Sequence, residues 1–295
     1  MTTDSFSAAK RLRVTFILSP ENSNGVFPGT NSNTLVLEDL RVRLQVQAVP
    51  GAISTNMSMA VYGMRKADMN ALTTIFFKSI NAIHQNTVIV DADSGDGYTQ
   101  VFSGMITEAQ PVYDGMPAAF FQVTGIVGYQ HQINPVPPSS YRGSVSVATV
   151  VADLAGKMGY AFENDGVTAV ISNPYLPGTY WDQLQRVCYA SYTQYVLAAD
   201  TLAIYPYGLP RTTVPTLTVS PADILQGYPG LEKYGLKLTT LFNPGLVPGG
   251  RVKVVGSDIP NANGLWFPFI VDHILEANIP GGLWQTVSQC QPVAP

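Results

Sequence analysis

The stretch "MITEAQPVYDGMPAAFFQV", residues 105–123, is echoed by "HILEANIPGGLWQTV", residues 273–287. Each has two segments of alternating apolar and polar residues joined by a turn with Pro and Gly, a pattern that predicts a β-hairpin. The second copy has the shorter turn and one extra residue, Thr286, before its Val. The matched positions are Ile106, Glu108, Ala109, Phe121, Gln122 and Val123 in the first copy, and Ile274, Glu276, Ala277, Trp284, Gln285 and Val287 in the second.

This echo has two explanations. Half-buried hairpins share an alternating pattern and turn residues, so a short match also arises by chance. If the match is no accident, the chain contains two related β modules, and the sequence around each hairpin should be organised in the same way.

The composition points to a protein that works in an assembly. Among 295 residues, hydrophobic side chains make up 46% and charged side chains only 12%, which is about half the usual charged share. A surface rich in Ser, Thr, Asn and Gln would explain this, but a surface covered by partners explains it as well, and we favour the assembly. The net charge of −4 argues against stable binding to nucleic acid, which needs clustered Lys and Arg.

The basic residues form short pairs, and the cysteines are few. Arg11 with Arg13 and Arg41 with Arg43 alternate along expected strands, so solvated strand faces explain them.

Neither a signal peptide nor a run of about 20 apolar residues is visible, and we expect synthesis in the cytoplasm without membrane anchoring. Cys188 and Cys290 are predicted to be buried free thiols.

The first part of the chain, residues 11–128, alternates in a way that predicts a six- or seven-stranded antiparallel unit. One helix is expected in "ADMNALTTIFFKSI", residues 67–80, with Asp68 as its N-cap. Its predicted apolar face consists of Met69, Leu72, Ile75, Phe76 and Ser79.

The middle part begins after "NPVPPSSY", residues 134–141, whose prolines and serines indicate a linker. A helix is predicted to follow, ending at Gly159, where a left-handed residue is favoured. A second helix should begin with a capping-box-like pair, Thr179 and Asp182. The predicted buried positions are Val147, Val150, Val151, Leu154 and Met158 in the first helix, and Trp181, Leu184, Val187 and Cys188 in the second.

A small sheet should complete this middle part. We expect its strands in "AVISNPYL", "QYVLAAD" and "LAIYPYG", residues 169–176, 194–200 and 202–208, with a hairpin turn at Asp200 and Thr201. The prolines of "PYGLPRTTVP", residues 206–215, indicate a second linker. From residue 216 the alternating pattern returns, and the second hairpin closes this part as the first hairpin closes the first part, which favours a duplication. The predicted domains are residues 1–135, 136–212 and 213–295.

Catalytic chemistry has little support in the sequence. The three histidines, His84, His131 and His273, have no spacing that would place two metal ligands on one element. His273 and Glu276 resemble half of a zinc motif, but residues three apart on a strand point to opposite faces. The segment "DADSGDGY", residues 91–98, lacks the calcium-loop Gly and closing Glu, so a hairpin turn is favoured. We therefore predict no enzyme, no cofactor, and no catalytic, cofactor-binding or metal-binding residues.

The order of these parts resembles the baseplate hub proteins of contractile-tailed bacteriophages. The similarity is carried by "VYGMRKADMNALT" at residues 61–73, "GTYWDQL" at residues 178–184 and "LFNPGLVPGGRV" at residues 241–252. It covers nearly the whole chain, without a lysozyme-like insert or spike repeat, so cell-puncturing activity would belong to another chain.

This resemblance implies a specific architecture. It implies two tail-tube-like antiparallel β-barrel domains flanking a small two-helix α+β domain, in a mostly β protein. Three such chains would present six similar modules, joining a sixfold tail tube to a threefold central spike. The implied partners are two further copies, the spike, tube and tape-measure proteins, and DNA only in passage. The implied location is the virion tail baseplate, assembled in the host cytoplasm.

A β-rich virion protein that binds a carbohydrate or a receptor is the competing interpretation. Exposed aromatic residues on loops would support it, and Trp266 and Phe267 could supply them. We favour packing of both rings, because aromatic side chains dominate cores and interfaces.

Overall fold

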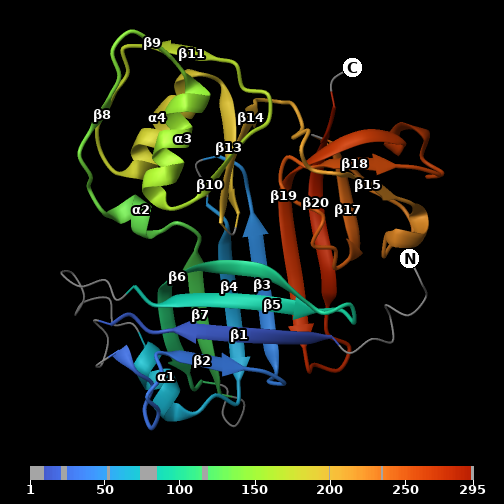
Figure 1. Cartoon of the computed structure of the whole chain (residues 1–295). Helices are drawn as coiled ribbons and strands as arrows, with labels where there is room; N and C mark the ends of the chain where they lie inside the picture. Colours follow the sequence, from blue (N-terminus) through green and yellow to red (C-terminus); the bar gives the residue numbers. More distant parts are fainter. Residues whose placement is uncertain are drawn as a thin grey trace. The chain divides into compact units, whose positions relative to one another are not determined.

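The computed structural model describes residues 10–20, 25–51, 54–73, 85–114, 119–198, 200–233 and 235–293 (Figure 1). The chain forms two compact units. The first unit comprises Met1–Val46, Asn56–Val127 and His273–Trp284, and the second comprises Gln47–Thr55, Gly128–Asp272 and Gln285–Pro295. Strands are the main secondary structure of the described residues, as predicted. None of the described helices is long and apolar enough to span a membrane.

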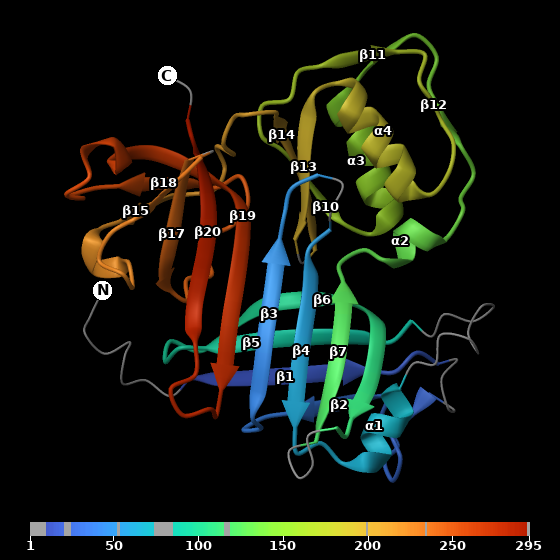
Figure 2. The ribbon, with the colours of Figure 1, turned by 180° about the vertical axis from the view of Figure 1, so that it is seen from behind.

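The first unit contains the predicted antiparallel strands in the order β3-β4-β7-β6-β5-β1-β2. Figures 1 and 2 show β1, β2 and β5 running across β3, β4 and β7 at a steep angle, so that the sheet folds over its own core. Their inward residues, such as Val14, Val88 and Phe121, are fully buried. The bounds are β1 Arg11–Ile17, β2 Thr34–Leu37, β3 Val42–Ala48, β4 Asn56–Tyr62, β5 Thr87–Asp93, β6 Tyr98–Val112 and β7 Phe120–Ile126.

The helix of this unit begins earlier than predicted. Helix α1 spans Lys66–Leu72, with Arg65 at the N-cap position, so the prediction of Asp68 as N-cap was wrong. Asp68 instead lies buried in the first turn, and its Oδ2 is 2.7 Å from Arg65 Nε. An acidic side chain is favoured there by the helix dipole as well as by the ion pair. Met69 and Leu72 are buried as predicted. The predicted positions Ile75, Phe76 and Ser79 lie outside the described residues.

The helices of the middle part form as the sequence predicts. Helix α3, Val147–Met158, ends at Gly159, whose φ of 79° is left-handed. Helix α4, Tyr180–Ala190, begins with the predicted capping box of Thr179 and Asp182. Every predicted stripe residue of both helices is buried. A short helix, α2, Gln130–Ile133, precedes them.

The small sheet under these helices differs from the prediction. It has the order β10-β14-β13, with β10 Ala161–Asn164, β13 Thr193–Ala198 and β14 Thr201–Pro206. The hairpin at Asp200 and Thr201 is confirmed, but "AVISNPYL" is not part of this sheet. It forms β11, Val170–Ser172, and β12, Tyr175–Leu176, which pair with β9, Ser144–Ser146, and β8, Ser139–Ser140. The Asn-Pro pair at residues 173–174 explains the break, because Asn173 adopts a positive φ of 47° and Pro lacks an amide donor.

The alternating pattern predicted from residue 216 onward corresponds to five of the six C-terminal strands, whereas β16 was not predicted. These strands are β15 Thr216–Val219, β16 Gly230–Glu232, β17 Gly235–Leu241, β18 Arg251–Val254, β19 Gly264–Ala277 and β20 Trp284–Pro292. In the second unit β16, β17, β20 and β19 are neighbours in that order. One pairing departs from an antiparallel module, since β15 runs parallel to β18. Leu236, Leu238, Val252 and Val271 contribute to the buried core of this region.

The two echoed segments both lie in hairpins, but their matched residues do not all share a face. Ile106 is buried because a bulge between Ile106 and Glu108 inserts one residue into β6, whereas Ile274 on the regular β19 is only half-buried. The extra Thr286 takes the inward position of β20 and leaves Val287 half-buried. The duplication therefore stays a hypothesis.

Candidate functional site

The two histidines within the described residues lie on different elements, α2 and β19. His84 lies outside the described residues. His131 is in α2, where burial lowers its pKa and its ring meets the Tyr160 ring edge-on at 5.8 Å. His273 is buried in β19, and burial lowers its pKa to about 4. Within the described ranges, no three His, Cys, Asp or Glu side chains are arranged to hold a metal ion.

The acidic segment at residues 91–98 is a hairpin turn between β5 and β6, as predicted. Asp93 Oδ1 accepts hydrogen bonds from the amides of Gly95 and Gly97, at 2.7 and 3.0 Å. Asp91 pairs with Arg13, whose Nη2 is 3.0 Å away. These carboxylates thus stabilise the turn and the sheet.

The basic pairs and the cysteines also have local explanations. The Arg41 guanidinium lies over the Tyr62 ring at 4.5 Å, and Arg43 pairs with Glu276 at 3.2 Å. Cys188 and Cys290 are buried free thiols, as predicted, and burial raises the pKa of each to about 12.

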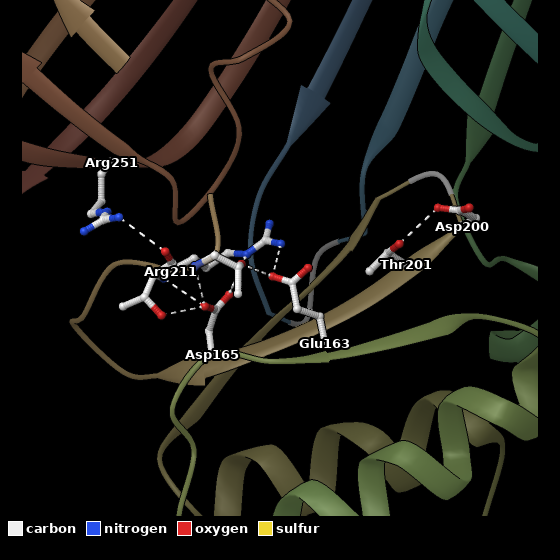
Figure 3. Close-up of polar contacts among 8 residues, drawn as sticks. Glu163, Asp165, Asp200, Thr201, Arg211 and Arg251 are labelled. Atoms are coloured by element: carbon white, nitrogen blue, oxygen red, sulfur yellow. Dashed lines mark hydrogen bonds and ion pairs between the residues drawn. The ribbon is translucent and has the colours of Figure 1, made fainter. Parts of the chain in front are cut away.

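A polar cluster around Arg211 is the most elaborate charged site of the second unit (Figure 3). Arg211 follows β14, in the segment predicted to be a linker. Its Nη2 donates to Glu163 Oε1 at 2.6 Å and its Nε to Asp165 Oδ2 at 3.2 Å. The Arg211 side chain is 10% exposed and the Asp165 side chain is completely buried. Charged groups this buried need partners, because desolvation costs several kcal/mol per ion.

Five donors converge on the Asp165 carboxylate. Besides Arg211 Nε, they are the amides of Thr212 and Thr213, both at 2.8 Å, and the two threonine hydroxyls, both at 2.9 Å. The Thr213 hydroxyl also lies against Glu163 Oε1. Burial opposes ionisation of Asp165, but the hydrogen bonds that its carboxylate accepts from Thr213 and Thr212 outweigh it and hold its pKa well below the usual range.

The other side of this segment is tied to the C-terminal strands. The Arg211 amide donates to Gly249 O at 2.7 Å, the Gly249 amide donates to Pro268 O at 2.7 Å, and Arg251 Nη2 donates to Thr212 O at 3.3 Å. Gly249 has a φ of 73°, and a Cβ there would lie 2.8 Å from the Tyr205 ring. A side chain at this position would therefore push the segment away.

The first predicted linker is held by a more exposed cluster. The Tyr141 hydroxyl donates to Asp153 Oδ2 at 2.5 Å, and Lys157 Nζ donates to the same oxygen at 2.8 Å. Lys157 and Asp153 side chains are 40% and 43% exposed. Lys157 Nζ also donates to Ser139 Oγ at 3.4 Å, so its ammonium group links the segment to helix α3.

The two aromatic residues considered for receptor binding differ in exposure from three tyrosines of the second unit. Trp266 and Phe267 are both buried, and Trp266 Nε1 donates to Ala262 O at 2.9 Å, so these rings pack as predicted. The sequence interpretation missed Tyr189, Tyr192 and Tyr207, which are 89%, 83% and 69% exposed. Tyr192 adopts a positive φ of 50°, and its carbonyl accepts from the Tyr207 amide. A positive φ is uncommon for a tyrosine. This feature could have drawn attention to the exposed tyrosines, but it can be seen in the structure and not in the sequence.

Comparison with known proteins identifies the fold. No protein-family profile matches the chain, and no curated protein sequence matches it. Among solved structures, a tail protein from Neisseria meningitidis MC58 matches with a TM-score of 0.59 and 13% identity, over 96% of both chains. The 43 kDa tail protein of prophage MuSo2 from Shewanella oneidensis matches with a TM-score of 0.57 and 10% identity, over 95% of this chain and 98% of that chain.

A type VI secretion component from E. coli also matches, with a TM-score of 0.58 and 10% identity, over 95% of this chain and 77% of that chain. It is described as structurally similar to the T4 bacteriophage tail proteins gp27 and gp5. At sequence identities of 10% to 13%, the structural similarity establishes the fold of this chain and not its role. The chain has the fold of phage tail proteins, and the resemblance predicted from the sequence is confirmed at that level.

Proposed function

We propose that this protein is a structural hub of a contractile phage tail, located in the baseplate of the virion. The observation that carries the proposal is the match to tail-protein folds over nearly the whole chain. In this role it is a homotrimer that joins the sixfold tail tube to the threefold central spike and lines the channel for DNA. The spike, tube and tape-measure proteins are its partners, and assembly takes place in the host cytoplasm.

The proposed hub has no catalytic task. Its carboxylates and basic residues at the sites described above are engaged in structural pairs, as with Arg13–Asp91 and Arg211–Asp165. The proposal includes three domains, residues 1–135, 136–212 and 213–295, of which the first and third are tube-like barrel modules. The competing receptor-binding interpretation lost its motivating residues when Trp266 and Phe267 proved to be buried.

Native mass spectrometry tests the oligomeric state. The purified chain is measured alone and after mixing with the candidate spike protein, and we expect the mass of three chains, free or with spike bound. A low charge content and exposed tyrosines support this, since interface cores are depleted of charge and enriched in Tyr. A stable monomer in the presence of the spike protein would contradict the hub function.

DNA binding tests the channel. DNA carries one negative charge per about 1.7 Å, so a channel for its passage should not present free basic clusters. Arg13 and Arg43 are paired with carboxylates, and Arg41 lies over an aromatic ring. A mobility-shift assay at physiological salt should give only weak, micromolar or weaker binding. A tight complex with steep salt dependence would place positive charge in the channel and overturn this part of the proposal.

A further inference from the structure

The Pro-rich segment after β14 is fixed on two sides. Toward β10, Arg211, Thr212 and Thr213 bind the carboxylates of Glu163 and Asp165. Toward the C-terminal strands, the Arg211 amide donates to Gly249 O, and Thr212 O accepts from Arg251. Three consecutive residues thus connect two parts of the second unit that are distant in sequence (Figure 3).

Partial opening of this segment is unfavourable. If Arg211 left its site, Asp165 would lose a charged partner while fully buried, and if Asp165 moved, the Arg211 charge would keep Glu163 as its single carboxylate partner among the described contacts. Breaking one side of a buried, hydrogen-bonded charge pair costs far more than breaking an exposed one. The contacts are therefore expected to form or break together.

We propose that Arg211–Thr213 is a strap that locks the α3–α4 part and the β15–β20 part of the second unit into one cooperative body. The strap suppresses hinge motion at a segment whose proline content is otherwise typical of a linker. The second unit then unfolds in one transition. This inference does not depend on the hub function, so either proposal can fail alone.

Limited trypsin digestion tests the strap, because trypsin cleaves after Arg211 only when the segment opens. In the native protein we expect cleavage after Arg142, which is exposed in a turn before β9, and protection after Arg211. Asp165→Asn places an amide nitrogen among the donors, and should speed cleavage after Arg211 by about tenfold or more, as expected for losing hydrogen bonds to a charged group. The matched control, Asp153→Asn in the exposed cluster, should leave that rate unchanged.

The outcomes separate clearly. Rapid cleavage after Arg211 in the unaltered protein, or no acceleration in a folded Asp165→Asn protein, overturns the strap. If Asp165→Asn does not fold, the same digestion is carried out on Thr213→Val, which replaces only a hydroxyl by a methyl group. Unchanged cleavage after Arg211 in that variant overturns the strap in the same way. Calorimetry gives a second readout, in which the strap predicts that Asp165→Asn splits the unfolding of the second unit into two transitions.

Discussion

The two Pro-rich segments that flank the α+β part look alike in sequence but are held in different ways. The first, residues 134–141, is tied by Tyr141 to a carboxylate whose side chain is 43% exposed. The second, residues 206–215, contains an arginine that reaches a fully buried carboxylate. The contrast teaches that a Pro-rich composition says little about mobility. Burial of the partners decides how strongly such a segment is fixed, since exposed ion pairs contribute little and buried ones resist disruption.

The largest effect is expected from Asp165→Ala in the second segment. It removes the fully buried one of the two carboxylates that pair with Arg211, and leaves the donors of Thr212 and Thr213 without their shared acceptor. The free energy of unfolding should fall by about 3–5 kcal/mol, the range for breaking a buried pair. Urea unfolding followed by circular dichroism measures this. A loss below about 1 kcal/mol, as for an exposed pair, would remove the contrast between the two segments.

Acid should weaken the second segment through the same carboxylate. The pKa of Asp165 is held below its unfolded value, so its contribution to stability is complete above the unfolded pKa of about 3.9 and is lost as the pH falls below it. Unfolding free energies measured from pH 6 down to pH 2 should therefore fall more steeply for the unaltered protein than for Asp165→Asn. Equal slopes would show that Asp165 is not the group that makes the free energy of unfolding depend on pH in this range.

Thr213→Val should have an intermediate effect. The Thr213 hydroxyl is shared between Glu163 and Asp165, while the Thr213 amide remains available in the variant. Loss of one hydrogen bond to a charged group should cost about 1.5–3 kcal/mol. Thr149→Val, in an exposed pair with Ser146, is the matched control and should cost less in the same urea experiment.

The smallest effect is expected from Asp153→Asn in the first segment. Hydrogen bonds from Lys157 and Tyr141 hold the pKa of Asp153 below its usual value, but solvent screens these exposed groups. The expected loss is about 1 kcal/mol or less, and it should shrink further in 1 M NaCl, where the Debye length is about 3 Å. A loss as large as that of Asp165→Ala would mean that the first segment is the stronger attachment.

Local signals allowed several elements to be predicted from the sequence. The capping box at Thr179 and Asp182 and the left-handed Gly159 fixed the ends of two helices, and alternation located most strands. Strand β10, "AFEN", was missed because four residues with two polar side chains give no clear alternation. The Arg211 cluster was also missed, since its partners lie 46 to 48 residues away in sequence. Prolines around it favoured a linker.

The β19–β20 hairpin has a consequence for how the protein is made. Residues His273–Trp284 belong to the first unit, where Trp284 Nε1 donates to Ser94 Oγ at 2.9 Å and Glu276 pairs with Arg43. During translation, the strands from β1 to β7 leave the ribosome long before this hairpin exists. At about 5–20 residues per second, the stretch from Gly128 to Asp272 takes on the order of ten seconds to synthesise. The first unit therefore waits for residues 273–284, synthesised well after its other strands, before its final contacts can form.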